Sequence, residues 1–144
     1  MTETPDDGAK LDAFIEDQRR RKHIFMVDSS RTFQHIITAL LEDERYGATA
    51  SDYVPEVFPQ IMLLKPDLII VDLVITEKAG WELLEKLEME ALTEKIPVIV
   101  TSTDHRLLER ALANKDRYGF DNYLVKPFDL DVLLSAIEEL IGPP

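Results

Sequence analysis

The chain has 144 residues, of which 45% are hydrophobic and 31% charged, a composition typical of one folded domain. It contains no cysteine, which excludes disulfide bonds, thiol catalysis and cysteine metal sites. The formal net charge of -12 predicts no binding to nucleic acid, because an acidic surface repels the phosphate backbone. No apolar run approaches the roughly 20 residues that cross a bilayer, and no secretory signal begins the chain, so we expect a cytoplasmic protein without a membrane partner.

Residues 1–22 are predicted to form an N-terminal extension that is partly disordered or forms a short helix. Its start is rich in small polar residues, which favour disorder. Over 11–22, Phe14 and Ile15 lie on one apolar helical face, and a basic cluster ends the segment where cations suit the helix dipole. We expect this helix to be frayed or to dock on the domain or on a second subunit. The folded domain is then expected to cover residues 23–144.

Beyond the extension, short apolar runs alternate with amphipathic segments. The run 23–27 predicts a buried strand, and the apolar spacing after it predicts a helix capped by Ser29 or Ser30. The segment 54–64 predicts a short or distorted helix, because Pro59 lies inside it. Further strands are expected at 48–51, 67–72, 97–101 and 123–125, and further helices at 79–92, 106–115 and 130–141, the last capped by Asp129.

Five strand–helix units in succession predict an α/β fold. Apolar strands separated by amphipathic helices indicate a parallel sheet covered on both faces, and right-handed crossovers favour a doubly wound arrangement. We therefore predict a flavodoxin-like, doubly wound, five-stranded parallel sheet of the (βα)5 type. Ligands of such sheets bind beyond the carboxyl ends of the strands, so the residues that end each strand are the candidates for chemistry.

Polar residues of complementary chemistry end four of the five predicted strands. Asp28 ends the first and Asp72 the third; Thr101 and Ser102 end the fourth, and Lys126 ends the fifth. A pair of carboxylates can hold a hard cation such as Mg²⁺, while a lysine and a hydroxyl can hold an anion. Each residue alone also has an ordinary explanation, for example Asp28 as a helix cap or Lys126 as a solvated charge. Their joint placement at the strand ends predicts a small phosphoryl site.

Several stretches, in order and at family-like spacing, resemble a known family. They are Val27–Asp28, the run 66–72, Gly80, the run 97–102 and the run 123–128. On these motifs the chain is similar to a response-regulator receiver domain of two-component signalling from Ile24 to Gly142. The resemblance implies a phosphoprotein that is not an enzyme in the usual sense, although it catalyses its own phosphorylation and dephosphorylation. Because the chain stops at Pro144, it resembles the stand-alone regulators, which act by docking to another protein or by relaying phosphate.

The resemblance also implies a role for each residue at the strand ends. Asp72 would accept a phosphoryl group from a histidine kinase or a phosphotransfer protein. Asp28, Asp72 and the backbone carbonyl of Val74 would hold Mg²⁺. Lys126 would pair with the acceptor carboxylate and then with the phosphoryl oxygens. Ser102 would move to bond the phosphoryl group.

The outgoing signal would be carried by Tyr123, which would shift inward together with Ser102. Thr101 competes for the hydroxyl role, but Ser102 lies five residues past Pro97, which is the family spacing, so we assign the role to Ser102. The implied partners are a downstream protein target and a second copy of the chain in a homodimer.

One position departs from the family pattern. Where the family usually has two adjacent acids after the first strand, the second is Ser29, whose hydroxyl attracts Mg²⁺ poorly and would contribute through a bound water. This substitution keeps an alternative open, namely a degenerate receiver that binds its partners without phosphorylation. A flavin site is disfavoured, because no Gly-rich or Ser/Thr-rich phosphate loop follows the first strand.

Overall fold

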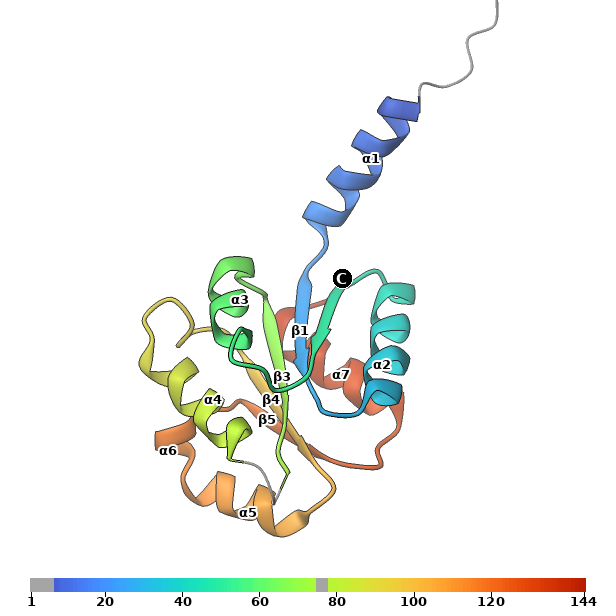
Figure 1. Cartoon of the computed structure of the whole chain (residues 1–144). Helices are drawn as coiled ribbons and strands as arrows, with labels where there is room; N and C mark the ends of the chain where they lie inside the picture. The colour runs from blue at the N-terminus through green and yellow to red at the C-terminus, as the bar shows by residue number, and fades with distance from the viewer. Residues whose placement is uncertain (1–6, 75–77) are drawn as a thin grey trace, which may run out of the picture.

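The computed structural model describes residues 7–74 and 78–144. Its centre is one parallel sheet of five strands in the order β2-β1-β3-β4-β5 (Figure 1). The strands are β1 His23–Val27, β2 Gly47–Ser51, β3 Leu68–Asp72, β4 Val98–Ser102 and β5 Asn122–Val125. This arrangement confirms the predicted doubly wound, flavodoxin-like sheet.

Helices cover both faces of the sheet, with α2 and α7 on one face and α3, α4 and α5 on the other (Figure 1). Their bounds are α1 Asp7–Arg20, α2 Arg31–Asp43, α3 Val57–Leu64, α4 Ala79–Met89, α5 His105–Ala113, α6 Lys115–Tyr118 and α7 Leu130–Ile141. The two faces follow from strand alternation. On β1, Phe25 and Val27 enter the core under α3 and α4, while Ile24 and Met26 enter the core under α2 and α7.

The proline-containing helix is short but regular. It begins at Val57 rather than at residue 54, so Pro59 is its third residue. A proline is tolerated there, because the amide groups of the first turn have no partner inside the helix. The helix ends at Leu64, and the C-cap residue Lys65 takes a left-handed conformation with φ 49°.

Two other helices end earlier than the sequence predicts. The helix expected to reach residue 92 stops at Met89, where the buried Thr93 hydroxyl donates to the Leu87 carbonyl over 2.8 Å. The helix expected over 106–115 breaks at Asn114, whose side-chain amide donates to the Arg110 carbonyl over 2.8 Å, and α6 follows. Polar side chains that bond to backbone carbonyls thus end both helices, which apolar spacing does not detect.

Of the two predicted helix caps, one forms a capping hydrogen bond and the other does not. Ser30, rather than Ser29, caps α2, and its hydroxyl accepts a hydrogen bond from the Phe33 amide over 3.2 Å. Asp129 stands at the N-cap position of α7 as predicted, but its side chain makes no capping hydrogen bond.

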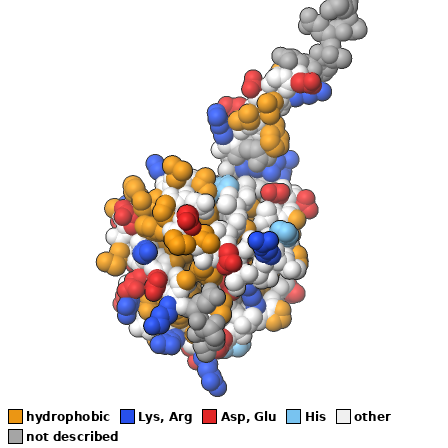
Figure 2. Space-filling view, viewed as in Figure 1, with side chains coloured by type: hydrophobic (Ala, Val, Ile, Leu, Met, Phe, Trp, Pro, Cys, Tyr) orange, Lys and Arg blue, Asp and Glu red, His pale blue; other side chains and the backbone are white. Residues whose placement is uncertain are grey.

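The extension contains helix α1, which begins at Asp7 and projects away from the domain (Figure 1). Residues 1–6 of the predicted disordered start lie outside the described part of the chain. The apolar side chains of α1 are exposed, with Leu11 at 58% and Phe14 at 60%, and Figure 2 shows hydrophobic atoms on the helix surface. Within the described ranges no helix is both long and apolar enough to cross a membrane.

Candidate functional site

Polar strand ends gather at the edge of the sheet that lies opposite α1. Asp72 is the last residue of β3, Asp28 follows β1, and Lys126 follows β5. Strands β1 and β3 are neighbours although β2 lies between them in the chain. This is the switch point at which doubly wound sheets bind their ligands.

Lys126 joins the two carboxylates. Its Nζ lies 2.6 Å from Oδ2 of Asp28 and 3.0 Å from Oδ1 of Asp72. Both acids are almost fully buried, with 1% of Asp28 and 6% of Asp72 exposed. Two buried negative charges in one place require a compensating cation, and the ammonium group of Lys126 supplies it.

Aromatic rings complete the surroundings of this lysine. Its Nζ lies 3.9 Å from the ring centroid of Phe33, which contacts Phe128 edge to face at 6.0 Å. A cation held over a ring face is stabilised by the ring's electron density. Phe33 is not among the site residues predicted from the sequence, although its place in the first turn of α2, directly after the Asp28 loop, is a usable signal.

Asp72 accepts a second hydrogen bond from a hydroxyl group. Oγ1 of Thr101 donates to Oδ1 of Asp72 over 2.9 Å. Burial raises the pKa of Asp72 above its ordinary value, and the nearby Asp28 charge raises it further. Lys126 and Thr101 stabilise the carboxylate and partly oppose the increase in pKa. The group is therefore a more basic carboxylate than an aspartate in water.

Asp28 is held by its own loop as well as by the lysine. Its Oδ1 accepts from the Ser30 amide over 2.8 Å, and its backbone carbonyl accepts from the Gln34 side chain. Ser29 lies between them in sequence but is exposed, and within the described residues its hydroxyl makes no hydrogen bond. The structure thus brings Asp28 into the site and leaves Ser29 at its solvent side.

Within residues 7–74 and 78–144, neither of the two predicted switch residues forms a hydrogen bond with Asp72. Ser102 is buried, and its hydroxyl donates to the Leu73 carbonyl over 2.8 Å and accepts from the Asp104 amide over 3.1 Å. Tyr123 lies on the edge strand β5 and is 40% exposed. The hydroxyl that donates to the Asp72 carboxylate belongs to Thr101, which strand pairing places beside Asp72.

The oxygen donors at the strand ends suit Mg²⁺. Asp28 and Asp72 present carboxylates that share one ammonium group and therefore lie close together, and Val74 follows two residues after Asp72. Mg²⁺ binds through one or two carboxylates and keeps several waters, so this donor set fits it in kind. Residues 7–74 and 78–144 contain no cluster of three His, Asp or Glu side chains suited to a metal. The donor set is therefore one carboxylate poorer than the family pattern.

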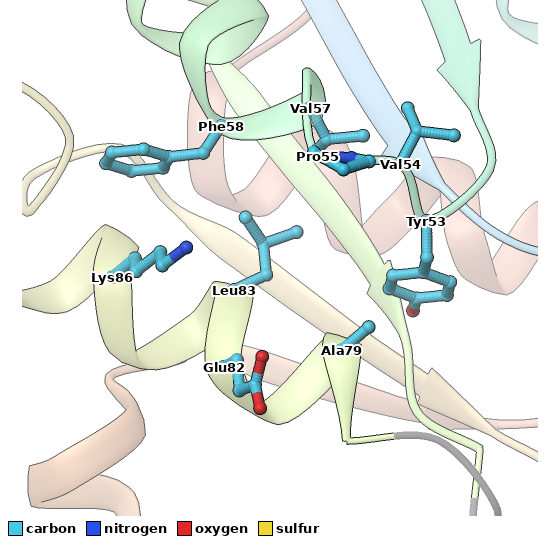
Figure 3. A pocket seen from close by; sticks show the side chains of 9 residues that line it. All are labelled: Tyr53, Val54, Pro55, Val57, Phe58, Ala79, Glu82, Leu83 and Lys86. Carbon is cyan, nitrogen blue, oxygen red and sulfur yellow. The ribbon is translucent and has the colours of Figure 1, made fainter.

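A separate pocket lies between the loop after β2, α3 and α4. It has a volume of about 340 Å³ and is lined mainly by apolar side chains, among them Val54, Phe58 and Leu83, with Glu82 and Lys86 at the α4 side (Figure 3). None of the strand-end residues lines it. We therefore assign the chemistry to the strand ends and not to this pocket.

Comparison with known families decides the identity of the domain. The sequence model of the response regulator receiver domain matches residues 24–138. The chain belongs to this family. The receiver therefore belongs to two-component signal transduction, and its five-stranded sheet is the sheet of that family.

Individual relatives agree with this assignment. The receiver is 28% identical to protein PilH of Pseudomonas aeruginosa over 119 residues, 83% of this chain and 97% of that protein. It spans 47% of the regulator KdpE of Staphylococcus aureus and 54% of PhoB of Pseudomonas aeruginosa, and is thus about half their length.

Solved structures show the same fold. A receiver domain of a histidine kinase from Syntrophus aciditrophicus has a TM-score of 0.73 at 28% identity, with 84% of this chain and 90% of that chain covered. A chemotaxis response regulator of Vibrio cholerae has a TM-score of 0.73 at 20% identity, with 83% of this chain and 98% of that chain covered.

Proposed function

We propose that this receiver accepts a phosphoryl group on Asp72 and signals by docking to other proteins or by relaying the group. The observation that carries the proposal is the buried carboxylate of Asp72 at the end of β3, held by Lys126 at 3.0 Å and by Thr101 at 2.9 Å. A buried carboxylate with a raised pKa is a stronger nucleophile than one in water. Its cationic neighbour Lys126 favours the ionised form of the carboxyl, which is the form that attacks phosphorus.

The transfer requires charge neutralisation more than covalent assistance. One Asp72 oxygen attacks phosphorus while the bond from phosphorus to the donor nitrogen or oxygen breaks, and the donor keeps that electron pair. Lys126 bridges both carboxylates. Its ammonium group would therefore also pair with the negatively charged phosphoryl oxygens during transfer. Asp28, Asp72 and the Val74 carbonyl would hold Mg²⁺, which supplies further positive charge when bound.

The output follows from new contacts made by the phosphoryl group. The group brings strong acceptor oxygens into a site where the Ser102 hydroxyl now donates to the Leu73 carbonyl. Exchange of that carbonyl for a phosphoryl oxygen would shift the end of β4 and, through it, the exposed Tyr123 on β5. The donor would be a histidine kinase or a phosphotransfer protein. The acceptor of the signal would be a downstream protein or a second copy of the receiver.

Intact mass measurement with a small phosphoryl donor tests the proposal. We expect acetyl phosphate to add one phosphoryl group to the wild type across a Mg²⁺ titration. Asp72→Asn should add none, because an amide is a far poorer nucleophile and forms no acyl phosphate. Labelling of Asp72→Asn to the wild-type level would place the acceptor elsewhere.

Ser29→Asp tests the departure from the family pattern. A second carboxylate beside Asp28 should lower the Mg²⁺ concentration needed for half-maximal labelling by about tenfold, the effect of roughly 1.4 kcal/mol in binding. Ser30→Ala, which removes the α2 cap without adding charge, is the matched control. If wild type and Ser29→Asp both stay unlabelled while folded, the degenerate receiver that binds without phosphorylation is the better description.

A further inference from the structure

The carboxylate of Asp72 is held asymmetrically. Its Oδ1 receives both the Thr101 hydroxyl at 2.9 Å and the Lys126 ammonium at 3.0 Å. Within the described ranges, no hydrogen bond or ion pair is made to Oδ2. The geometry therefore leaves Oδ2 as the oxygen that is available to form the bond to phosphorus.

Thr101 is placed for this contact by the sheet itself. Asp72 and Thr101 are directly paired across β3 and β4, so their side chains emerge from the same face of the sheet. Thr101 is completely buried and follows the apolar run Val98–Val100. A buried hydroxyl needs a partner, and Asp72 is the one that this hydroxyl has. The neighbouring Ser102 hydroxyl is committed to the Leu73 carbonyl instead.

We propose that Thr101 is a positioning residue that shortens the lifetime of phosphorylated Asp72. The inference rests on the proposed function and goes beyond it, because it assigns control of the signal's duration to a residue outside the predicted switch pair. Thr101 acts through Oδ1 of Asp72 and does not itself contact the phosphoryl group in this assignment.

The chemistry follows from where charge moves during hydrolysis of the acyl phosphate. Water attacks phosphorus, the bond from phosphorus to Oδ2 breaks, and its electron pair returns to the Asp72 carboxylate, while the water protons pass to the phosphate product and solvent. Oδ1 changes from an acyl carbonyl oxygen into half of a carboxylate. A hydrogen bond to an ionised acceptor is roughly twice as strong as one to a neutral acceptor. The Thr101 hydroxyl thus stabilises the departing carboxylate more than the acyl phosphate, which speeds the loss of phosphate.

The experiment compares Thr101→Val, which removes the hydroxyl, with Thr101→Ser, which keeps it. Each protein is phosphorylated with acetyl phosphate, the donor is removed, and the decay is followed by intact mass. We expect the half-life of Thr101→Val to be longer by about fivefold, and that of Thr101→Ser to stay within about twofold of wild type. An unchanged or shorter half-life for Thr101→Val would overturn the proposal. If the valine variant does not fold, Thr101→Ala takes its place with the same expectation.

The same decay measurement separates this inference from the proposed function. If wild type is never phosphorylated, the proposed function fails and the lifetime role falls with it. If wild type is phosphorylated but the half-life is unchanged in Thr101→Val, only the role of Thr101 is wrong. A half-life near that of wild type in Thr101→Ser, beside a longer one in Thr101→Val, would tie the effect to the hydroxyl group.

Discussion

The strand-end site and helix α1 both gather charge, but in opposite surroundings. In the site, Lys126 contacts Asp28 at 2.6 Å and Asp72 at 3.0 Å, and both acids are buried. On α1, Glu16 and Arg20 pair at 3.7 Å with most of their side chains in water. Exposed ion pairs of this kind contribute about 0–1 kcal/mol, whereas loss of one partner from a buried pair costs about 3–5 kcal/mol.

The comparison shows that burial determines what each ion pair can do. Water around α1 screens its charges, so they add solubility and little else. At the strand ends, the protein replaces water, so Asp28 and Lys126 change the pKa of Asp72, and the proposed transfer of a phosphoryl group would use the same charges. Three variants test this contrast through the free energy of unfolding.

Lys126→Met should give the largest effect. Methionine keeps most of the packing on Phe33 but removes the cation between the two buried carboxylates, so the free energy of unfolding should fall by about 3 kcal/mol at neutral pH. The loss should shrink in mild acid, because protonation of Asp72 removes one of the two facing charges. Denaturant unfolding at both pH values measures it. Arg20→Met on α1 is the matched control and should change stability by less than about 0.5 kcal/mol. Equal losses in the two variants would contradict the contrast.

Asp72→Asn should stabilise the fold at neutral pH by roughly 1 kcal/mol, as expected when a functional charge is held at the expense of stability. The raised pKa means that folded Asp72 binds its proton more tightly than the unfolded chain does. Stability from this group is therefore lost as pH rises from the ordinary pKa of aspartate through the raised one, and it stays lost at neutral pH. The asparagine variant should lack that part of the pH dependence. If Asp72→Asn is less stable than wild type at neutral pH, the contacts of the Asp72 carboxylate with Lys126 and Thr101 stabilise the fold by more than its burial costs.

Deletion of residues 1–20 should have the smallest effect. Helix α1 is exposed and contributes an ion pair between Asp17 and Arg45 at 3.6 Å to the rest of the domain, so the free energy of unfolding should change by less than about 1 kcal/mol. The transition should remain cooperative. Leu84→Ala, which empties a fully buried position, is the positive control and should cost about 2–5 kcal/mol. Loss of cooperative unfolding in the shortened chain would show that α1 is integral to the domain.

The sequence by itself determined the fold and the convergence of the strand ends. Apolar runs such as Ile24–Val27 and the helical spacing after them are local patterns that backbone geometry converts directly into strands and helices. Once the strands are parallel, their carboxyl ends must share one edge, which is why Asp28, Asp72 and Lys126 could be grouped in advance.

Only the tertiary structure decided which hydroxyl meets Asp72. Thr101 and Ser102 are adjacent and chemically alike, and family spacing favoured Ser102 for the switch role. The pairing of β3 with β4 places Thr101 beside Asp72, and the Ser102 hydroxyl donates to the Leu73 carbonyl instead. Register between strands distant in sequence is set by packing of the whole sheet, and a shift by one residue exchanges the faces of every side chain. The local sequence pattern does not specify this register. The hydrogen bond from Thr101 to Asp72 could therefore be identified only from the folded domain.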